Sequence, residues 1–504
     1  MTTHTNPATP DPSDDAASSR PGRLGVWHNP NAEYVYGLGQ SGTIAAVIGL
    51  LAVFAAFIPP DHKPRNIAIT LLVAAVAVGP FAIRDRWGRN LITIANHEAR
   101  WAIHRATGRN LHTAPPWLTA SSTQVTGVRL PGLLSNMSIA EHQLDDTTRY
   151  AVIHHPASNT VSVVIECRPA GDTLADPDTT TGHVNAWERW LAAMADEPHL
   201  AAIQIVTEAA PTHHNPNTSD DSDDGGFCGR VLAETLEACT GRIGTRTWVT
   251  VSWATPGRTR TALTSDVLPA RVERLCTALT EAGAGPTTPV SQEGLAVLWA
   301  GMYDPDRRQT IAEHPDTPLD LVDAIPVTAV ERRHRYELGP VDAVSLTMGA
   351  PPDRTVTTAV HKRLARGVDG AETVRWALLL RPVPSGEARE WTARIQRAID
   401  TRLAFTGDRR PKIADQVADD QTTSTATTLA HGHHALTRVA FALTLTLPAG
   451  ADTAGPIERV RNAVAPLTPH LRVMDGAHQT SWVATLPGGV PIPEALGVSE
   501  GLNQ

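Results

Sequence analysis

Two uncharged apolar segments constrain this chain more than any other feature. Residues 42–58 (GTIAAVIGLLAVFAAFI) and 67–83 (IAITLLVAAVAVGPFAI) contain no charged side chain. At a helical rise of about 1.5 Å per residue, each covers roughly 25 Å of a hydrocarbon core about 30 Å thick. Because only a short proline-rich stretch separates them, they predict a transmembrane helical hairpin at 37–84. Two buried helices of a soluble domain are the alternative.

The basic residues around this hairpin predict its orientation. Six arginines lie within residues 84–109, whereas the connection between the two segments carries only Lys63 and Arg65. Positive charge accumulates on the cytoplasmic side of membrane proteins. We therefore expect a plasma (inner) membrane protein with two spans, whose N-terminus and C-terminal domains are both cytoplasmic.

The part of the chain that follows the hairpin, about 420 residues, is long enough for two or three folded domains. The whole chain has 504 residues, of which 41% are hydrophobic, and its first 36 residues are polar and rich in turn-forming residues. We expect a disordered tail at 1–36, a basic juxtamembrane helix and linker at 85–117, cytoplasmic α/β domains at 118–310 and 311–492, and a tail at 493–504. In the juxtamembrane helix, Leu91, Ala95, Ala99, Ala102 and Ala106 share one face.

Periodicity predicts both strands and helices in these domains. Alternating or β-branched runs predict strands at 149–153, 160–167, 200–208, 245–253, 372–383 and 437–447. Helical periods predict helices at 183–196, 228–240, 263–283 and 291–303, and a helical arm at 385–405 and 411–428. Residues 454–465 and 482–486 are expected to complete the sheet. The predicted fold class is α+β: an N-terminal transmembrane helical hairpin followed by cytoplasmic mixed α/β domains with open sheets, without a fixed-period repeat.

Glycine motifs give no support to a nucleotide or dinucleotide site. Residues 37–42 spell G-x-G-x-x-G, but an apolar segment follows directly, where a dinucleotide fold needs a strand, a turn and a soluble helix. The nearest approach to a phosphate-binding loop, 241–247 (GRIGTRT), lacks the lysine that such loops require. We expect no cofactor.

Histidines and cysteines are the candidate metal ligands. The pairs His154–His155 and His213–His214 and the cluster His431, His433 and His434 could bind zinc only if they converged, so exposed turn histidines are the favoured interpretation. The four cysteines form no C-x-x-C pair and are expected to be free thiols. We predict no metal site.

Two further groups of side chains invite comparison with active sites. Asp304, Asp306, Arg307 and Arg308 follow an apolar helix and could line an active site, although a capped helix end or an inter-domain salt bridge is favoured. Trp187 and Trp190 lie three residues apart on one predicted helix face and indicate a core or an interface. We therefore predict no catalytic residue and no enzyme.

The order of the segments carries a resemblance to secretion proteins. The segment at 31–40 (NAEYVYGLGQ), which runs into the two-span hairpin, resembles the PrgI-like and VirB-type inner-membrane subunits of conjugative type IV secretion systems. Residues 413–430, 434–447 and 478–489 (HQTSWVATLPGG) resemble the non-catalytic amino-terminal region of VirB-type secretion ATPases, without the motor domain. The whole is similar to an actinobacterial two-span membrane protein family of conjugative or type IV-like secretion loci.

This resemblance implies a function. It implies a non-enzymatic structural subunit that anchors or docks a separate secretion ATPase and is oligomeric within a complex of membrane subunits. The net charge of −9 argues against direct binding of nucleic acid. The chain also resembles EccE, a type VII secretion subunit. A membrane-tethered enzyme, with His154, His155 or the Asp304 cluster in its site, is the third hypothesis.

Overall fold

The computed structural model describes nine stretches of the chain. They are residues 91–113, 130–169, 177–212, 242–255, 267–314, 317–348, 359–406, 435–465 and 471–488. The predicted transmembrane hairpin at 37–84 and the predicted disordered tail at 1–36 lie outside them. Within these stretches, none of the helices has the length and apolar character needed to cross a membrane.

The described strands form one 13-stranded sheet in which every neighbouring pair is antiparallel. The main path of the sheet runs β1-β8-β9-β10-β12-β11-β5-β6-β4-β3-β2, with β13 beside β10 and β7 beside β4. The strands are β1 (Leu111–Thr113), β2 (Ser138–Gln143), β3 (Arg149–His155), β4 (Thr160–Cys167), β5 (Leu200–Pro211), β6 (Ile243–Ala254), β7 (Thr287–Pro289), β8 (Thr328–Glu331), β9 (Tyr336–Glu337), β10 (Val341–Met348), β11 (Thr373–Pro382), β12 (Thr437–Pro448) and β13 (Leu471–Val473).

The helices complete the described fold. They are α4 (Leu91–Ala106), α5 (Pro177–Ala195), α8 (Leu268–Leu279), α9 (Gln292–Tyr303), α10 (Arg307–Glu313), α11 (Ala359–Leu364), α12 (Ser385–Thr406), α14 (Ala454–Val464) and α15 (His478–Ala484). Local chemistry explains the start of α9 and the extended conformation of β4. The Ser291 side chain accepts a bond from the Gly294 backbone N–H and so begins α9. The β-branched residues of β4 favour an extended strand.

The chain order reveals an internal duplication. In the first half, β4, α5, β5, β6, α8 and β7 follow one another, and their strands lie in the order β7-β4-β6-β5. In the second half, β10, α11, β11, β12, α14 and β13 repeat the pattern with the order β13-β10-β12-β11. This is the split βαβ topology of ferredoxin-like folds. A hairpin precedes each module (β2–β3 and β8–β9), and a helix follows each (α9 and α15).

The two modules are joined edge to edge. Their β5 and β11 strands pair antiparallel from Ile203 opposite Leu380 to Ala209 opposite Val374. Val206 faces Ala377 near the middle of this ladder, and the modules are related by an approximate twofold axis there. Each module therefore covers the open edge that the other would otherwise expose to solvent.

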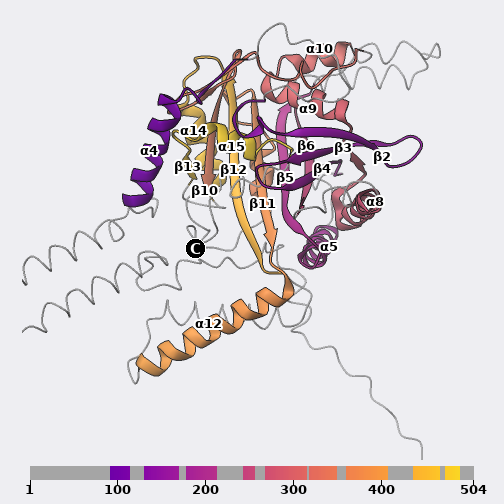
Figure 1. Ribbon diagram of the computed structural model, residues 1–504, viewed down its shortest axis with the longest axis vertical. Coiled ribbons are helices and arrows are strands. Elements are labelled where there is room, and N and C mark those ends of the chain that lie inside the picture. Colours follow the sequence, from indigo (N-terminus) through magenta and orange to yellow (C-terminus); the bar gives the residue numbers. More distant parts are fainter. Residues whose placement is uncertain are drawn as a thin grey trace, which may run out of the picture.

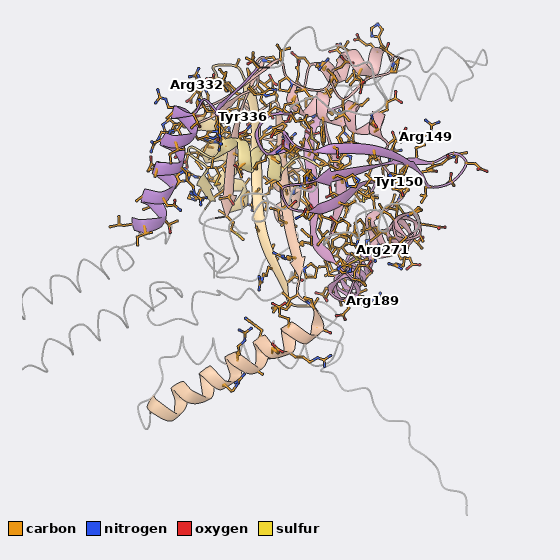
Figure 2. All side chains as sticks on the ribbon, in the orientation of Figure 1. Arg149, Tyr150, Arg189, Arg271, Arg332 and Tyr336 are labelled. Atoms are coloured by element: carbon orange, nitrogen blue, oxygen red, sulfur yellow. The ribbon has the colours of Figure 1, made fainter. Side chains whose placement is uncertain are left out.

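Helices cover both faces of the sheet (Figure 1). On one face, α5 and α8 enclose a core with Ile203 in the first module, and α11 and α14 enclose a second core with Leu443 in the other. On the opposite face, α9 and α15 share a single core with Val206 and Ala377. This second face is the one that spans the junction between the modules. Figure 2 shows Arg332 at the end of the molecule that carries α4, and Arg189 and Arg271 at the opposite end.

The predicted fold class is wrong in its arrangement. We expected mixed α/β domains with open sheets after the hairpin, but the described strands form a single antiparallel sheet. In each module, a third strand lies between the two that a helix connects, so no parallel pair forms. The expectation that 454–465 and 482–486 would complete the sheet is also wrong, because α14 and α15 occupy these residues.

Most of the other predicted elements are confirmed. The strand at 160–167 coincides with β4, the helix at 291–303 with α9, and the first helix of the arm with α12. The predicted helix at 183–196 begins earlier, since α5 starts at Pro177. The predicted helices at 228–240 and 411–428 lie outside the described residues.

Candidate functional site

A row of polar side chains crosses the sheet at the junction of the two modules. Arg246 of β6 lies opposite Glu208 of β5, which lies opposite Arg375 of β11. The row continues through Thr444 of β12 to Ser345 of β10. Directly opposed residues of an antiparallel pair share one face of the sheet. The middle of the row is deeply buried: Glu208 is 1% exposed and Arg375 is 0% exposed.

Glu208 is the anion at the centre of this row. Arg308 of α10 donates to Glu208 Oε1 at 2.7 Å, and Arg375 Nη1 lies 3.7 Å from the same oxygen. Burial alone raises the pKa of a carboxyl group, but Arg308, Arg375 and Arg246 together hold the pKa of Glu208 below its usual value. The carboxylate is therefore ionised at neutral pH and joins α10, β5 and β11.

Arg375 connects this carboxylate to α15. Its Nε donates to Thr485 Oγ1 at 3.3 Å, and its guanidinium lies 5.1 Å from the centre of the Trp482 ring. Trp482 in turn packs against Tyr303, with ring centres 4.4 Å apart. Burial lowers the pKa of Arg375 to about 10, an effect that Glu208 opposes, so the side chain remains charged near neutral pH. Tyr303, the last residue of α9, thus contacts the helix that follows the second module.

Hydroxyl groups extend the network into the second module. Thr485 Oγ1 lies 2.9 Å from Thr444 Oγ1, which lies 3.1 Å from Ser345 Oγ. The Ser345 backbone N–H donates to His478 Nδ1 at 3.2 Å. Burial lowers the pKa of His478 to about 4, so its imidazole is neutral in the folded protein. A continuous polar chain therefore runs from α10 to the start of α15.

The segment after α15 crosses to the first module. Gln204 Nε2 donates to the carbonyl groups of Ala484 at 2.7 Å and Leu486 at 2.9 Å. Trp299 Nε1 donates to Pro487 O at 2.9 Å, and His155 Nε2 donates to Gly488 O at 2.7 Å. Leu486, Pro487 and Gly488 belong to the LPGG sequence at 486–489. In this structure they tie the second module to β3, β5 and α9 of the first.

Several buried polar atoms in this centre have no hydrogen-bond partner among the described residues. They are Glu208 Oε2, Arg308 Nη1, Arg375 Nη1 and Nη2, Tyr303 Oη and Trp482 Nε1. A guanidinium does not release its proton near neutral pH, and Glu208 is held ionised. The centre is therefore suited to holding elements together by charge, and poorly suited to transferring protons.

The charged residues at 304–308 make salt bridges and hydrogen bonds with neighbouring elements. Arg308 pairs with Glu208 at 2.7 Å, a salt bridge within the first predicted domain (118–310) and not the inter-domain bridge that was expected. Asp304 accepts a bond from the Asp306 backbone N–H at 3.2 Å, and the Arg307 guanidinium donates to the Asp323 carbonyl. These residues close the turn between α9 and α10.

The other residues that the sequence analysis considered are separated or lie outside the structure. Among the described contacts, none joins His155 to Asp304. Trp187 and Trp190 are in contact, with tilted rings whose centres lie 4.6 Å apart, and both pack in the core beneath α5, as predicted. The histidines at 213–214 and 431–434 and the glycine motif at 37–42 lie outside the described residues.

Metal ligands do not converge in the part of the chain that the structure describes. No group of three or more His, Cys, Asp or Glu side chains there could hold a metal ion. Cys167 and Cys276 are free thiols, as predicted, and burial raises the pKa of Cys167 to about 12. A thiol with so high a pKa is a poor nucleophile.

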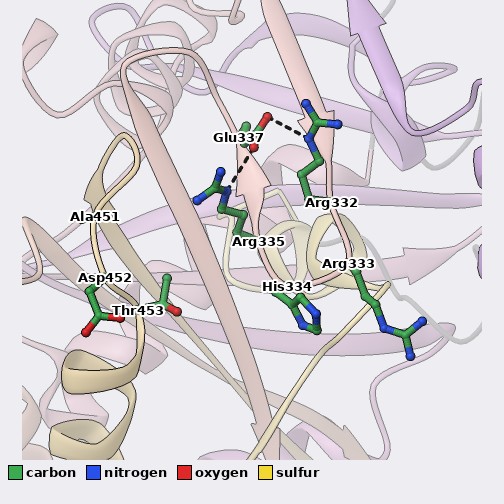
Figure 3. A pocket seen from close by; sticks show the side chains of 8 residues that line it. All are labelled: Arg332, Arg333, His334, Arg335, Glu337, Ala451, Asp452 and Thr453. Atoms are coloured by element: carbon green, nitrogen blue, oxygen red, sulfur yellow. Dashed lines mark hydrogen bonds and ion pairs between the residues drawn. The ribbon is translucent and has the colours of Figure 1, made fainter.

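A basic crevice lies between the β8–β9 turn and the start of α14 (Figure 3). Its volume is about 440 Å³, and its lining residues are Arg332, Arg333, His334, Arg335, Glu337, Ala451, Asp452 and Thr453. Arg332 and Arg335 both pair with Glu337, at 3.1 and 3.0 Å. Arg333 pairs with Glu98 at 2.9 Å and His334 with Asp475 at 3.0 Å. Since each basic side chain already has a carboxylate, the crevice is not a strong anion site.

Sequence reasoning missed the central residues of the junction. Glu208, Arg375 and Gln204 lie in strands that are mostly apolar, and a polar or charged residue within such a strand was the available signal. The fold and the centre define a protein built from two ferredoxin-like modules that share one sheet through a buried ionic joint. No model of a known protein family matches the chain. A comparison with curated proteins likewise found no similar sequence.

Proposed function

We propose that this chain is a non-enzymatic subunit of a conjugative or type IV-like secretion machine at the plasma membrane, where it docks a separate secretion ATPase. The observation that carries this proposal is the helix α12, which extends away from the sheet (Figure 1). Its 22 residues correspond to roughly 33 Å of helix. A helix that leaves the body of a protein presents a surface to a partner.

The position of α12 in the topology supports a role outside the core. Strands β11 and β12 are antiparallel neighbours, and Pro382 lies opposite Thr437 at their ends. The Val383 backbone N–H donates to Leu436 O at 2.8 Å and continues the ladder. A two-residue turn could join these strands. The residues between them are thus an insertion that the sheet does not require.

The ionic joint supports a scaffold function. Glu208, Arg308 and Arg375 fix the two modules and α10 to one another through buried charges. A subunit that docks a partner must hold it at a fixed position relative to the membrane anchor. One continuous sheet holds this position more rigidly than two domains joined by a linker. The membrane location rests on the apolar composition of residues 42–58 and 67–83.

The test compares two shortened hairpins in the native host. One variant replaces residues 384–435 with Asn-Gly. The matched control likewise replaces residues 213–241 with Asn-Gly. These residues connect β5 to β6, the corresponding strands of the first module, and the Thr212 backbone N–H donates to Arg242 O at 2.9 Å where the connection begins. Each variant complements a strain that lacks the gene, and the frequency of conjugative transfer is measured.

The two variants are expected to differ. Transfer should fall to the level of the deletion strain without α12 and persist with the control, provided that both proteins accumulate in the membrane. Wild-type transfer in the deletion strain would overturn the proposal. Equal transfer by both variants would show that α12 is not the docking element.

A further inference from the structure

Helix α4 turns its polar side toward the body of the protein. Polar contacts to the body include three side chains of the helix: His97 Nε2 donates to Asp475 O at 2.6 Å, Glu98 pairs with Arg333 at 2.9 Å, and His104 lies 3.2 Å from Glu331. The Trp101 ring lies over Gly476, where an added Cβ would come within 3.2 Å of it. The helix is therefore held by polar contacts and one indole ring.

The apolar side of α4 faces outward. Leu91 and Ile92 are each 42% exposed and Ile103 is 60% exposed, while Ala95 and Ala99 are exposed on the same side. No residue of this helix is buried. A surface helix normally packs its apolar stripe on the core and shows its polar side to water. Here Trp101 and Ile94 are half-buried, but the stripe that contains Leu91, Ile92 and Ile103 is left uncovered by the described residues.

The charges beside this stripe identify the partner. Arg100 and Arg105 are exposed on the helix, and Arg109 follows it. Glu98, the acidic residue of α4, is occupied by Arg333. An apolar stripe with cationic flanks is the pattern of a helix that lies in the interface of an anionic bilayer. A second protein surface would have to supply both an apolar groove and acidic residues.

The sequence before α4 favours the same partner. Only residues 84–90 (RDRWGRN) separate Leu91 from the uncharged segment at 67–83. Three of these seven residues are arginines. If the uncharged segment enters the bilayer, these seven residues, which span at most about 25 Å when fully extended, keep the first turn of α4 near the headgroup region.

We propose that the outward face of α4 docks in the headgroup region of an anionic membrane, with Ile92 and Ile103 in contact with lipid and Arg100 and Arg105 with lipid phosphate. This inference rests on the proposed membrane location. It sets the orientation of the body, because Asp475, Arg333 and Glu331 connect α4 to α15 and to the β8–β9 turn. The sheet then lies at a fixed distance from the membrane.

Photo-crosslinking in the full-length protein tests the proposal. Benzoylphenylalanine is introduced in place of Ile103, and the protein is reconstituted into vesicles of phosphatidylcholine and phosphatidylglycerol. Val267, which is 45% exposed just before α8, is the matched control position. After illumination, adducts are identified by mass spectrometry. Lipid adducts are expected at position 103 and not at position 267.

Three outcomes overturn the inference. They are adducts of position 103 with a second copy of the chain, equal lipid adducts at both positions, and no adduct at position 103. The charge contribution is tested by combining Arg100→Gln and Arg105→Gln, which should lower the yield of the phosphatidylglycerol adduct by about tenfold. An unchanged yield would refute recognition of anionic lipid. Transfer frequency in the hairpin variants is a separate readout, so failure here is distinguishable from failure of the proposed function.

Discussion

Removing the charge of Glu208 should be among the most destabilising single changes in this protein. Glu208→Gln keeps the shape of the side chain but leaves Arg308 and Arg375 without their shared anion. Glu208 is 1% exposed, so water cannot replace the lost charge. Removing one partner of a buried ion pair costs about 3–5 kcal/mol. Since a folded domain is stable by about 5–15 kcal/mol, this is a large fraction of the total.

The free energy of unfolding is measured by urea titration of the full-length protein in mild detergent, followed by tryptophan fluorescence. Glu458→Gln is the control, because Glu458 pairs with Arg461 on the surface and is 64% exposed. An exposed pair of this kind contributes about 0–1 kcal/mol. Adding Arg375→Met to Glu208→Gln should recover part of the loss, because it removes an unpaired buried cation. If Glu208→Gln costs no more than Glu458→Gln, the ionic joint does not hold the modules together.

Three further predictions follow from buried contacts. Burial lowers the pKa of His155 and His478 from 6.5 to about 4. Each neutral imidazole therefore contributes up to about 3 kcal/mol to the free energy of unfolding. This contribution is complete above pH 6.5 and is lost as the pH falls toward 4. His155→Gln should flatten the dependence of melting temperature on pH in this range, and an unchanged slope would contradict the assignment. Gln204→Leu leaves two buried carbonyl groups without a donor, at a cost of about 1–3 kcal/mol each, and should increase hydrogen exchange across α15. Gly476 has a φ of 71°, so Gly476→Val should displace Trp101 and increase hydrogen exchange in α4 but not in α8.

The sequence predicted elements whose patterns are local. The β-branched run of β4 and the continuous apolar run of α9 are sufficient to place both elements. Residues 454–465 were misassigned although Ile457, Val460 and Val464 follow a helical spacing, because a strand was expected after β12. The sheet is instead completed by β13, which has only three residues and too short a pattern to detect.

The duplication could not be read from periodicity. The two modules have the same topology, but the insertions in their corresponding hairpins differ in length: 212–242 in the first and 383–436 in the second. Unequal insertions shift every later element and remove any constant period. The pairing of β5 with β11 is also invisible locally, because it joins strands that are far apart in the chain.

The candidate site was only partly predictable. The position of Arg308 after an apolar helix predicts a structural salt bridge, but the pattern of residues 200–208 gives no sign that Glu208 is its partner. Glu208 and Arg375 become meaningful only when the register of β5 and β11 places them opposite each other. Likewise, the LPGG segment was identified by resemblance, whereas its contacts with Gln204, Trp299 and His155 depend on the tertiary fold.

The central claim is that this chain docks a secretion ATPase. Affinity purification of the tagged full-length protein from its own membranes in mild detergent, with identification of all co-purifying proteins, tests it most directly. The account predicts that a conjugation-type ATPase is recovered with the wild-type chain and with the 213–241 control, and is lost when residues 384–435 are replaced. Recovery of type VII secretion subunits instead, or of no stable partner, would contradict it.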